Sequence, residues 1–376
     1  MRTSYCNGFA GQLTRESKSG IRGGWVKNNT IKPERAENIT ESLLNWYDES
    51  KRDLLWRHTH DPYAVWISEI MAQQTRIAYL LSYYERFMGR FPTIQSLAEA
   101  REDDVLKAWE GLGYYARAKN LQKAAQKAMT DWGGQLPRTK EELLTLPGIG
   151  DYTAGAILSI AYGIPVPAVD GNVLRVYTRL ENVDEDILLP QTKKLAAAFV
   201  EALMPSERAG CFTQALMELG ALVCLPKNPD CAVCPIAAFC QAKARGRQRE
   251  LPKKSAKKPP EPLQKTVLII RNANGEILVR RRTESLLSGL WEFYLADSAM
   301  TKAKAKIHLK ERGFSVESMK DIGAAKHIFT HQIWYMTGYD CAVTDDFLPA
   351  GYQWVLKKDI KNLAFPTAIR FYMEKI

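Results

Sequence analysis

The chain has 376 residues, of which 46% are hydrophobic and 25% are charged, and its formal net charge at pH 7 is +10. This composition is that of a globular protein, and no apolar run reaches the roughly 18 to 20 residues of a membrane-spanning helix, so no transmembrane segment is predicted. The N-terminus lacks the basic and then apolar pattern of a signal peptide, so we expect a cytoplasmic protein whose cysteines stay reduced.

The length of the chain predicts two domains rather than one. Its positive charge is concentrated in two segments: residues 1–37 carry seven basic residues against three acidic ones, and residues 243–260 carry eight against one. The first segment has little periodicity and is predicted to be a mobile leader. The second contains prolines, so residues 243–261 are predicted to link two domains. Its charge fits both attraction to phosphates and a merely solvated linker.

Apolar residues recur at helical spacing between residues 38 and 242. The stretch SEIMAQQTRIAYLLSYYERFM, for example, places six apolar residues between Ile70 and Met88 at three- and four-residue steps, which predicts one buried helix. Further stretches repeat the pattern between short Gly, Pro and Asp segments. Since no run with a period of two competes, this region is predicted to be all-α.

The pattern changes after residue 261. The segment KTVLIIRNANGEILVRRR contains two β-type runs around Asn274-Gly275, which predicts a hairpin. AKAKIHLKERG is helical in pattern, whereas HQIWYMTGYDCAV and GYQWVL are typical of strands. Residues 262–376 are therefore predicted to form a smaller α+β domain.

Four of the seven cysteines lie within residues 224–240. Cys224, Cys231, Cys234 and Cys240 are separated by six, two and five residues. In a reducing compartment this cluster indicates a metal site rather than two disulfides. Four thiolates on a compact loop can hold either a zinc ion or an iron–sulfur cluster, and the spacing alone does not choose between them.

The stretch LPGIGDYTAGAI joins two helical runs through a turn that contains Gly148 and Gly150. Such a turn can expose backbone N–H groups to a phosphate at the next helix's N-terminus, although a plain helix connection gives the same pattern. An isolated acid, Asp170, follows about twenty residues later in VPAVDGNVLRV, and Glu69 precedes it in WISEIMAQQT. Taken alone, Asp170 fits a turn and Glu69 fits a solvated helix surface.

Together these motifs resemble the MutY family of adenine DNA glycosylases, within the helix-hairpin-helix superfamily that includes endonuclease III. LLWR, SEIMAQQT, GLGYYARA, LPGIGDYTAGAI, VDGNVLRV and the cysteine cluster occur in the family's order. The resemblance implies a mainly α helix-hairpin-helix glycosylase domain at residues 38–242 and a Nudix-like α+β recognition domain at residues 262–376. It also implies that the four cysteines hold one four-iron four-sulfur cluster.

The resemblance implies roles for the acids as well. Glu69 is expected to protonate the adenine, and Asp170 to stabilise the cationic sugar, with Tyr152 and Asn172 in support. Superfamily members that also cut the backbone carry a lysine where this chain has Tyr152, so we predict a monofunctional glycosylase. The family's adenine pocket maps onto three further residues: Trp56, Arg57 and Gln214.

DNA contacts follow from the same resemblance. Gln74 and either Tyr114 or Tyr115 are expected beside the orphan base, with helix-end packing as the alternative for the tyrosines. Gly148 and Gly150 are expected at a phosphate. The family usually has Phe-Ser-His, which reads 8-oxoguanine, at the position of Phe329, Thr330 and His331. The alternative for these residues is the start of a strand with a surface histidine.

The predicted substrate is double-stranded DNA with adenine opposite 8-oxoguanine or guanine, and the predicted protein is monomeric, with a nucleoid association if it is bacterial. Two other functions compete: an endonuclease III-like lyase for oxidised pyrimidines, and a catalytically silent iron–sulfur protein that binds DNA. Nudix pyrophosphatase activity is not expected, because Glu311 is essentially the only acid in the stretch where such enzymes bind magnesium.

Overall fold

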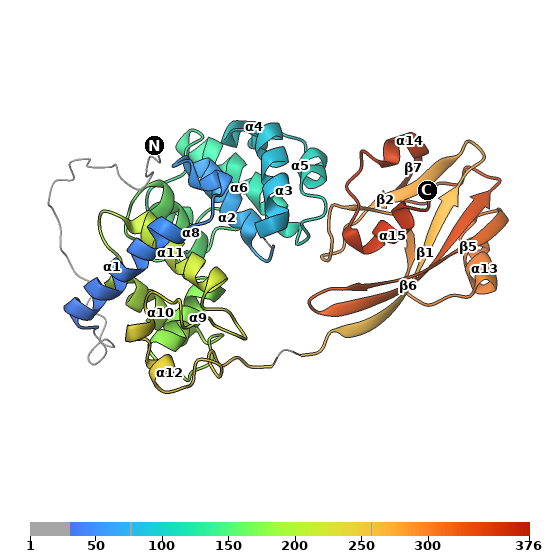
Figure 1. The fold of residues 1–376 in the computed structure, drawn as a ribbon. Coiled ribbons are helices and arrows are strands. Elements are labelled where there is room, and N and C mark those ends of the chain that lie inside the picture. Colours follow the sequence, from blue (N-terminus) through green and yellow to red (C-terminus); the bar gives the residue numbers. More distant parts are fainter. Residues whose placement is uncertain (1–30, 76, 257) are drawn as a thin grey trace. The chain divides into compact units, whose positions relative to one another are not determined.

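The structure is a computed structural model that describes residues 31–75, 77–256 and 258–376. The chain divides into two compact units (Figure 1). The first unit consists of the described residues up to Tyr84 together with Lys127–Ala256. The second consists of Glu85–Gln126 and the described residues from 258 onwards.

The first unit is helical. Its helices are α1 (Pro33–Ser50), η1 (Leu55–Arg57), α2 (Pro62–Ala72), α7 (Lys140–Leu143), α8 (Asp151–Ala156), η2 (Ile157–Ala161), α9 (Gly171–Leu180), α10 (Pro190–Leu203), α11 (Ala209–Leu222), η3 (Ala237–Phe239) and α12 (Gln241–Ala244). Two more, α3 (Ile77–Arg90) and α6 (Ala116–Trp132), pass from one unit into the other. The prediction that residues 38–242 are all-α is confirmed for the described part of that range.

One helix expected from the sequence is in fact two. The apolar stripe that predicted a single helix from Ile70 to Met88 is divided where α2 ends at Ala72, and α3 begins at Ile77. Gln74, between them, has a φ of 59°, a left-handed conformation that an α-helix cannot contain. Helical spacing of apolar residues survives such a break, so the stripe did not reveal it.

Local sequence accounts for the start of α2. Asp61 precedes the helix, and its carboxylate accepts hydrogen bonds from the backbone N–H groups of Tyr63 and Ala64 at 3.1 and 3.3 Å. Pro62 occupies the first helical turn, where its missing N–H costs no hydrogen bond. These features fix where α2 begins, and so they place the side chains that follow along it.

The second unit contains the C-terminal sheet. Its elements are α4 (Ile94–Ala98), α5 (Glu102–Ala108), β1 (Glu261–Arg271), β2 (Glu276–Arg281), β3 (Trp291–Glu292), β4 (Tyr294–Ala296), α13 (Lys302–Glu311), β5 (Val316–Ile328), β6 (Gln332–Val343), β7 (Tyr352–Leu356), α14 (Lys357–Ile360), η4 (Thr367–Ile369) and α15 (Arg370–Met373). The sheet order is β3-β2-β1-β6-β5, with β4 paired to β1 and β7 paired to β2. β1 and β6 are parallel, and β5 and β6 form an antiparallel hairpin. The predicted hairpin between β1 and β2 is confirmed, with Gly275 at a φ of 74°.

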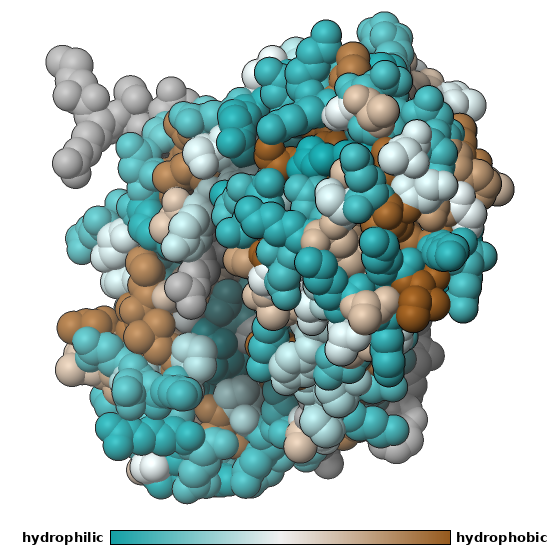
Figure 2. Space-filling view, turned by 90° about the vertical axis from the view of Figure 1, so that its right-hand side faces the viewer, coloured by the Kyte–Doolittle hydropathy of each residue, from teal (hydrophilic) through white to brown (hydrophobic). Residues whose placement is uncertain are grey.

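Both faces of this sheet are covered, because β1 is apolar on both sides. Val267 and Ile269 pack with residues of η4 and α15, whereas Leu268 and Ile270 pack with α13. This alternation has the period of two that a strand requires. In Figure 2, hydrophilic side chains cover most of the visible face, and hydrophobic ones form only small groups. The predicted combination of a helical region with an α+β domain is confirmed. Among the described helices, none is long and apolar enough to cross a membrane.

Candidate active site

Glu69 is a buried acid in an apolar helix. All residues of α2 from Tyr63 to Met71 are buried, Glu69 among them. The hydroxyl of Tyr152, from α8, donates a hydrogen bond to Glu69 Oε2. The pKa of Glu69 is raised to about 7, mainly by burial; the Tyr152 hydrogen bond opposes this rise and the Asp170 carboxylate adds to it. At neutral pH a large fraction of molecules therefore carries the proton on Glu69.

Asp170 occupies the N-cap position of α9. Its Oδ1 accepts a hydrogen bond from the Val173 backbone N–H at 2.7 Å, and its Oδ2 accepts one from Asn172 Nδ2 at 2.9 Å. Burial raises the pKa of Asp170, but these hydrogen bonds favour the ionised form and limit the rise. The cap therefore fixes the Asp170 carboxylate close enough to Glu69 for its charge to raise the pKa of Glu69.

The three residues expected around adenine come from two elements. Trp56 and Arg57 lie in η1, and Gln214 lies in α11. The buried Trp56 ring meets Tyr84 edge to face at 5.2 Å. The charge of Arg57 lowers the pKa of Glu69, so η1 lies within electrostatic reach of the acid. α11 also reaches the acid through Met217, whose Sδ lies 3.9 Å from the Tyr152 hydroxyl.

A second buried acid, Glu218, was missed from the sequence. Its side chain is 1% exposed and accepts hydrogen bonds from two arginines: Arg57 at 3.1 and 2.8 Å, and Arg52 at 2.8 and 2.6 Å. Burial alone would raise the pKa of Glu218, but these hydrogen bonds lower it to about 2. A lone acid in the apolar stretch LMELGAL was a signal for a buried ion pair.

Asn172 is held on the side away from Asp170. Its Oδ1 accepts a hydrogen bond from Arg175 Nη2 at 2.8 Å. Arg175 also donates to the backbone oxygens of Gly220 and Cys224, each at 2.7 Å. A Cβ on Gly220 would lie 2.5 Å from the Asn172 Cβ, so only glycine lets α11 approach α9 this closely. The position of Asn172 therefore depends on a residue without a side chain.

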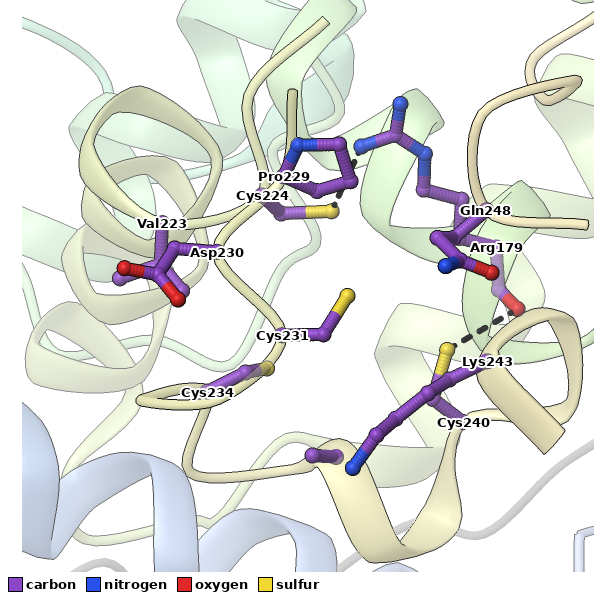
Figure 3. A pocket seen from close by; sticks show the side chains of 11 residues that line it. Arg179, Val223, Cys224, Pro229, Asp230, Cys231, Cys234, Cys240, Lys243 and Gln248 are labelled. Carbon is purple, nitrogen blue, oxygen red and sulfur yellow. Dashed lines mark hydrogen bonds between the residues drawn. The ribbon is translucent and has the colours of Figure 1, made fainter. Parts of the chain in front are cut away.

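The four clustered cysteines line one cavity (Figure 3). All four are free thiols. Arg179 contributes to the same cavity and donates from Nη1 to Cys224 Sγ at 3.2 Å, while its backbone oxygen lies 3.4 Å from Cys240 Sγ. The donors therefore fit a group that prefers thiolate ligands, with a cation beside them. Among the described residues, however, no group of three or more Cys, His, Asp or Glu is gathered closely enough to hold a single ion.

The expected phosphate site is a turn ahead of α8. Gly148 has a φ of 81°, which other residues rarely adopt, and Gly150 is the N-cap of α8. Lys140 lies just before this turn, and its Nζ forms an ion pair with Asp151 at 2.7 Å. No other lysine occurs between residues 128 and 192.

Gln74 is exposed in the break between α2 and α3.

The remaining DNA-contact candidates lie in the second unit. Tyr114 is 53% exposed and has a φ of 48°, whereas Tyr115 is buried. Phe329, Thr330 and His331 form the connection between β5 and β6, with the Phe329 ring 4.9 Å from that of Trp334. Tyr114 and Thr330 meet through their hydroxyls at 3.1 Å.

Comparison with known proteins places the chain in a family. The model described as "HhH-GPD superfamily base excision DNA repair protein" matches residues 67–205, and the NUDIX domain model matches residues 266–375. The adenine DNA glycosylase of Homo sapiens is 33% identical over 97% of this chain and 79% of its own length. That of Mus musculus is 33% identical over 88% of this chain and 76% of its own length.

The fold agrees with a solved structure. A thermostable thymine-DNA glycosylase is 28% identical in sequence, with a TM-score of 0.52 over 56% of this chain and 98% of its own. The resemblance seen in the sequence, the predicted fold class and the prediction of a DNA glycosylase are confirmed by these comparisons. The chain belongs to the adenine DNA glycosylase family.

Proposed function

We propose that this adenine DNA glycosylase removes adenine from double-stranded DNA in which it is mispaired with 8-oxoguanine or guanine. Glu69 is the general acid and Asp170 stabilises the sugar. The observation that carries the assignment is the burial of Glu69, which raises the pKa of Glu69 to about 7, in a site that also contains Asp170. Cleavage of a glycosidic bond uses two carboxyl groups, one that donates a proton and one that stabilises the sugar.

The reaction begins with proton transfer. Glu69 gives its proton to a ring nitrogen of the flipped adenine, so that the base can leave with the electron pair of the N-glycosidic bond. The Tyr152 hydroxyl donates a hydrogen bond to Glu69 and so stabilises the carboxylate that remains after the proton has left. Water then adds to the sugar carbon and releases a proton, which completes the hydrolysis.

Asp170 acts on the sugar. As the bond to adenine lengthens, positive charge develops on the sugar, and the Asp170 carboxylate stabilises it. Hydrogen bonds from Asn172 and the Val173 backbone hold this carboxylate in one orientation. A side chain held before the reaction starts requires no reorganisation as the charge develops, so Asn172 supports the step through Asp170.

Trp56, Arg57 and Gln214 are proposed to form the adenine pocket. Trp56 supplies a flat apolar surface, and Gln214 can match the donor and acceptor edge of adenine. Arg57 is fixed by Glu218 at 2.8 Å, so its charge stays in place beside the acid. A glycosylase needs such a pocket because its target base is turned out of the duplex before it is cleaved.

We propose that the enzyme does not cut the DNA backbone. A lyase needs an amine that attacks the sugar to form an imine. Tyr152 has no amine, and Lys140, the one lysine nearby in sequence, is ion-paired with Asp151. These residues weigh against the alternative of an endonuclease III-like lyase.

Recognition of the opposite base is assigned to residues outside this pocket. Gln74 and the exposed Tyr114 are proposed to contact the orphan base, and Thr330 with its neighbours to read 8-oxoguanine. The buried Tyr115 supports the loop rather than touching DNA. The backbone N–H groups near Gly148 and Gly150 are proposed to bind a phosphate.

We propose that Cys224, Cys231, Cys234 and Cys240 hold a four-iron four-sulfur cluster. The four thiols line one cavity, and their spacing of six, two and five residues is the spacing that the resemblance associates with this cluster. Arg179, beside Cys224, offsets the negative charge of the ligands. The cluster would fix the loop near Lys227 against the DNA backbone. Iron and acid-labile sulfide at four each per chain would support this proposal, and bound zinc would contradict it.

The test of the proposed function is a single-turnover assay on duplexes that contain adenine opposite 8-oxoguanine, guanine or thymine. We expect adenine release from the first two duplexes, breaks only after alkali, and no release by Glu69→Gln or Asp170→Asn. Trapping of a covalent imine on abasic DNA by borohydride would refute the monofunctional assignment. His331→Ala should lose the preference for 8-oxoguanine over guanine, and an unchanged preference would remove these residues from base reading.

A further inference from the structure

A tyrosine outside the proposed catalytic set contacts residues assigned to the adenine pocket. Tyr47, near the end of α1, is 2% exposed, and its hydroxyl donates a hydrogen bond to Gln214 Oε1 at 3.0 Å. The cationic ends of Lys51 and Arg57 each lie 5.5 Å from the centre of its ring. One buried ring therefore contacts two of the three residues assigned to the adenine pocket.

The surroundings hold Tyr47 in one position and one protonation state. Its ring packs in the core formed by α1, α9 and α11, where Phe212 and Leu216 are also buried. Burial raises the pKa of Tyr47 to about 12, so the hydroxyl stays protonated at neutral pH. Arg57, on the ring face, is itself fixed by Glu218. Tyr47 is thus a rigid hydrogen-bond donor.

We propose that Tyr47 is a positioning residue that determines which end of the Gln214 amide meets the 6-substituent of the flipped purine. The inference rests on the proposed placement of Gln214 in the adenine pocket. An amide oxygen has two lone pairs, and Tyr47 uses one of those on Gln214 Oε1. The other can still accept a hydrogen bond, and the amide nitrogen, which makes no hydrogen bond within the described part of the chain, can donate.

This orientation distinguishes a 6-amino purine from a 6-oxo purine. Adenine presents a donor at its 6-amino group beside an acceptor at N7, which matches an amide oxygen beside an amide nitrogen. Hypoxanthine and guanine present a 6-oxo acceptor there, which would face the oxygen of Gln214. Without the Tyr47 hydroxyl the amide could turn over and offer its nitrogen to the 6-oxo group. The hydroxyl therefore selects by repulsion as well as by attraction.

The experiment compares two bases in one enzyme. Single-turnover excision rates are measured for adenine and for hypoxanthine, each opposite the same 8-oxoguanine, in the intact protein, Tyr47→Phe and Gln214→Ala. Tyr162→Phe is the matched control, because its hydroxyl also donates a hydrogen bond, to the Leu136 backbone oxygen at 2.6 Å. A loss of stability would slow both bases alike, whereas a change of selectivity alters the ratio of the two rates.

We expect Tyr47→Phe to lower the ratio of adenine to hypoxanthine excision at least fivefold, while Tyr162→Phe keeps the ratio of the intact protein. A ratio that is unchanged in Tyr47→Phe but altered in Gln214→Ala would overturn the role of Tyr47 and leave the pocket assignment intact. A ratio that neither variant changes would remove Gln214 from the pocket and the inference with it.

Discussion

Replacing Glu69 with glutamine should stabilise the protein while it abolishes catalysis. Glu69 lies in the apolar part of α2, and burial raises its pKa from about 4.5 to about 7. Because the folded pKa is the higher one, the folded state resists ionisation of this group. The intact protein therefore loses stability as pH rises from about 4.5 to about 7, and the loss persists at higher pH. Glutamine keeps the shape of the side chain without the charge.

The size of the effect follows from the pKa of Glu69 in the unfolded and folded states. A tenfold difference in acidity between the two states corresponds to about 1.4 kcal/mol, so a pKa raised from 4.5 to about 7 costs the intact protein roughly 3 kcal/mol at pH 8. Because pH 5 lies only slightly above the unfolded pKa, little of this penalty has accumulated there, and the difference is about 1 kcal/mol. For a domain of this size, about 3 kcal/mol corresponds to roughly 6–12 °C in Tm.

Thermal unfolding of the intact protein and of Glu69→Gln at pH 5 and pH 8 measures this difference. Glu41→Gln, at an exposed position of α1, is the matched control and should shift Tm by no more than about 2 °C. The gain in Glu69→Gln should be about three times larger at pH 8 than at pH 5. A gain that is equal at both pH values, or a loss of stability, would refute the argument that Glu69 is a strained acid.

Three further perturbations test the surroundings of the acid. Single-turnover rates of the intact protein should fall about fivefold between pH 7 and pH 8, as Glu69 loses its proton. Tyr152→Phe should move this fall to higher pH, because the hydrogen bond from Tyr152 lowers the pKa of Glu69. A fall that stays at the same pH in Tyr152→Phe would contradict the contact. Gly220→Ala should slow adenine release at least tenfold, because the added Cβ displaces Asn172. Gly89→Ala is the control and should leave the rate unchanged, because a Cβ there meets nothing within 4 Å. Equal rates of adenine release in the two variants would show that the position of Asn172 does not affect catalysis. Glu218→Gln should lower the free energy of unfolding at pH 7 by about 3 kcal/mol, whereas Glu181→Gln, at a more exposed ion pair, should lower it by at most about 1 kcal/mol. The stability due to Glu218 should disappear as pH falls from about 4.5 toward 2. Similar losses in the two variants would contradict the buried ion pair.

Periodicity predicted the elements that bury one continuous face. The helices of the first unit and the hairpin at Gly275 followed from spacing and turn residues. The break between α2 and α3 did not, because the apolar spacing continues through Gln74 even though its backbone is left-handed. β5 was also missed, since its residues from Val316 to Ile328 alternate only partly between buried and exposed.

The candidate site shows the same division. Glu69 and Asp170 were singled out through their motifs, and in the structure the Asp170 carboxylate raises the pKa of Glu69. Tyr47 was missed because the apolar stripe of α1 explains it as a core residue, and Glu218 because its arginine partners are far away in sequence. Arg175 and Gly220 act through contacts between α9 and α11, which are far apart in sequence. Contacts between distant helices leave no local pattern, so sequence reasoning found the two candidate acids but not the residues that contact their surroundings.

The most direct test of the central claim is the single-turnover rate of adenine release from an adenine:8-oxoguanine duplex by the intact protein, Glu69→Gln and Asp170→Asn at pH 7. If Glu69 supplies the proton and Asp170 the negative charge, the intact protein releases free adenine, and each variant binds the duplex but loses at least a hundredfold in rate. Adenine release that persists in either variant would show that the reacting groups lie elsewhere.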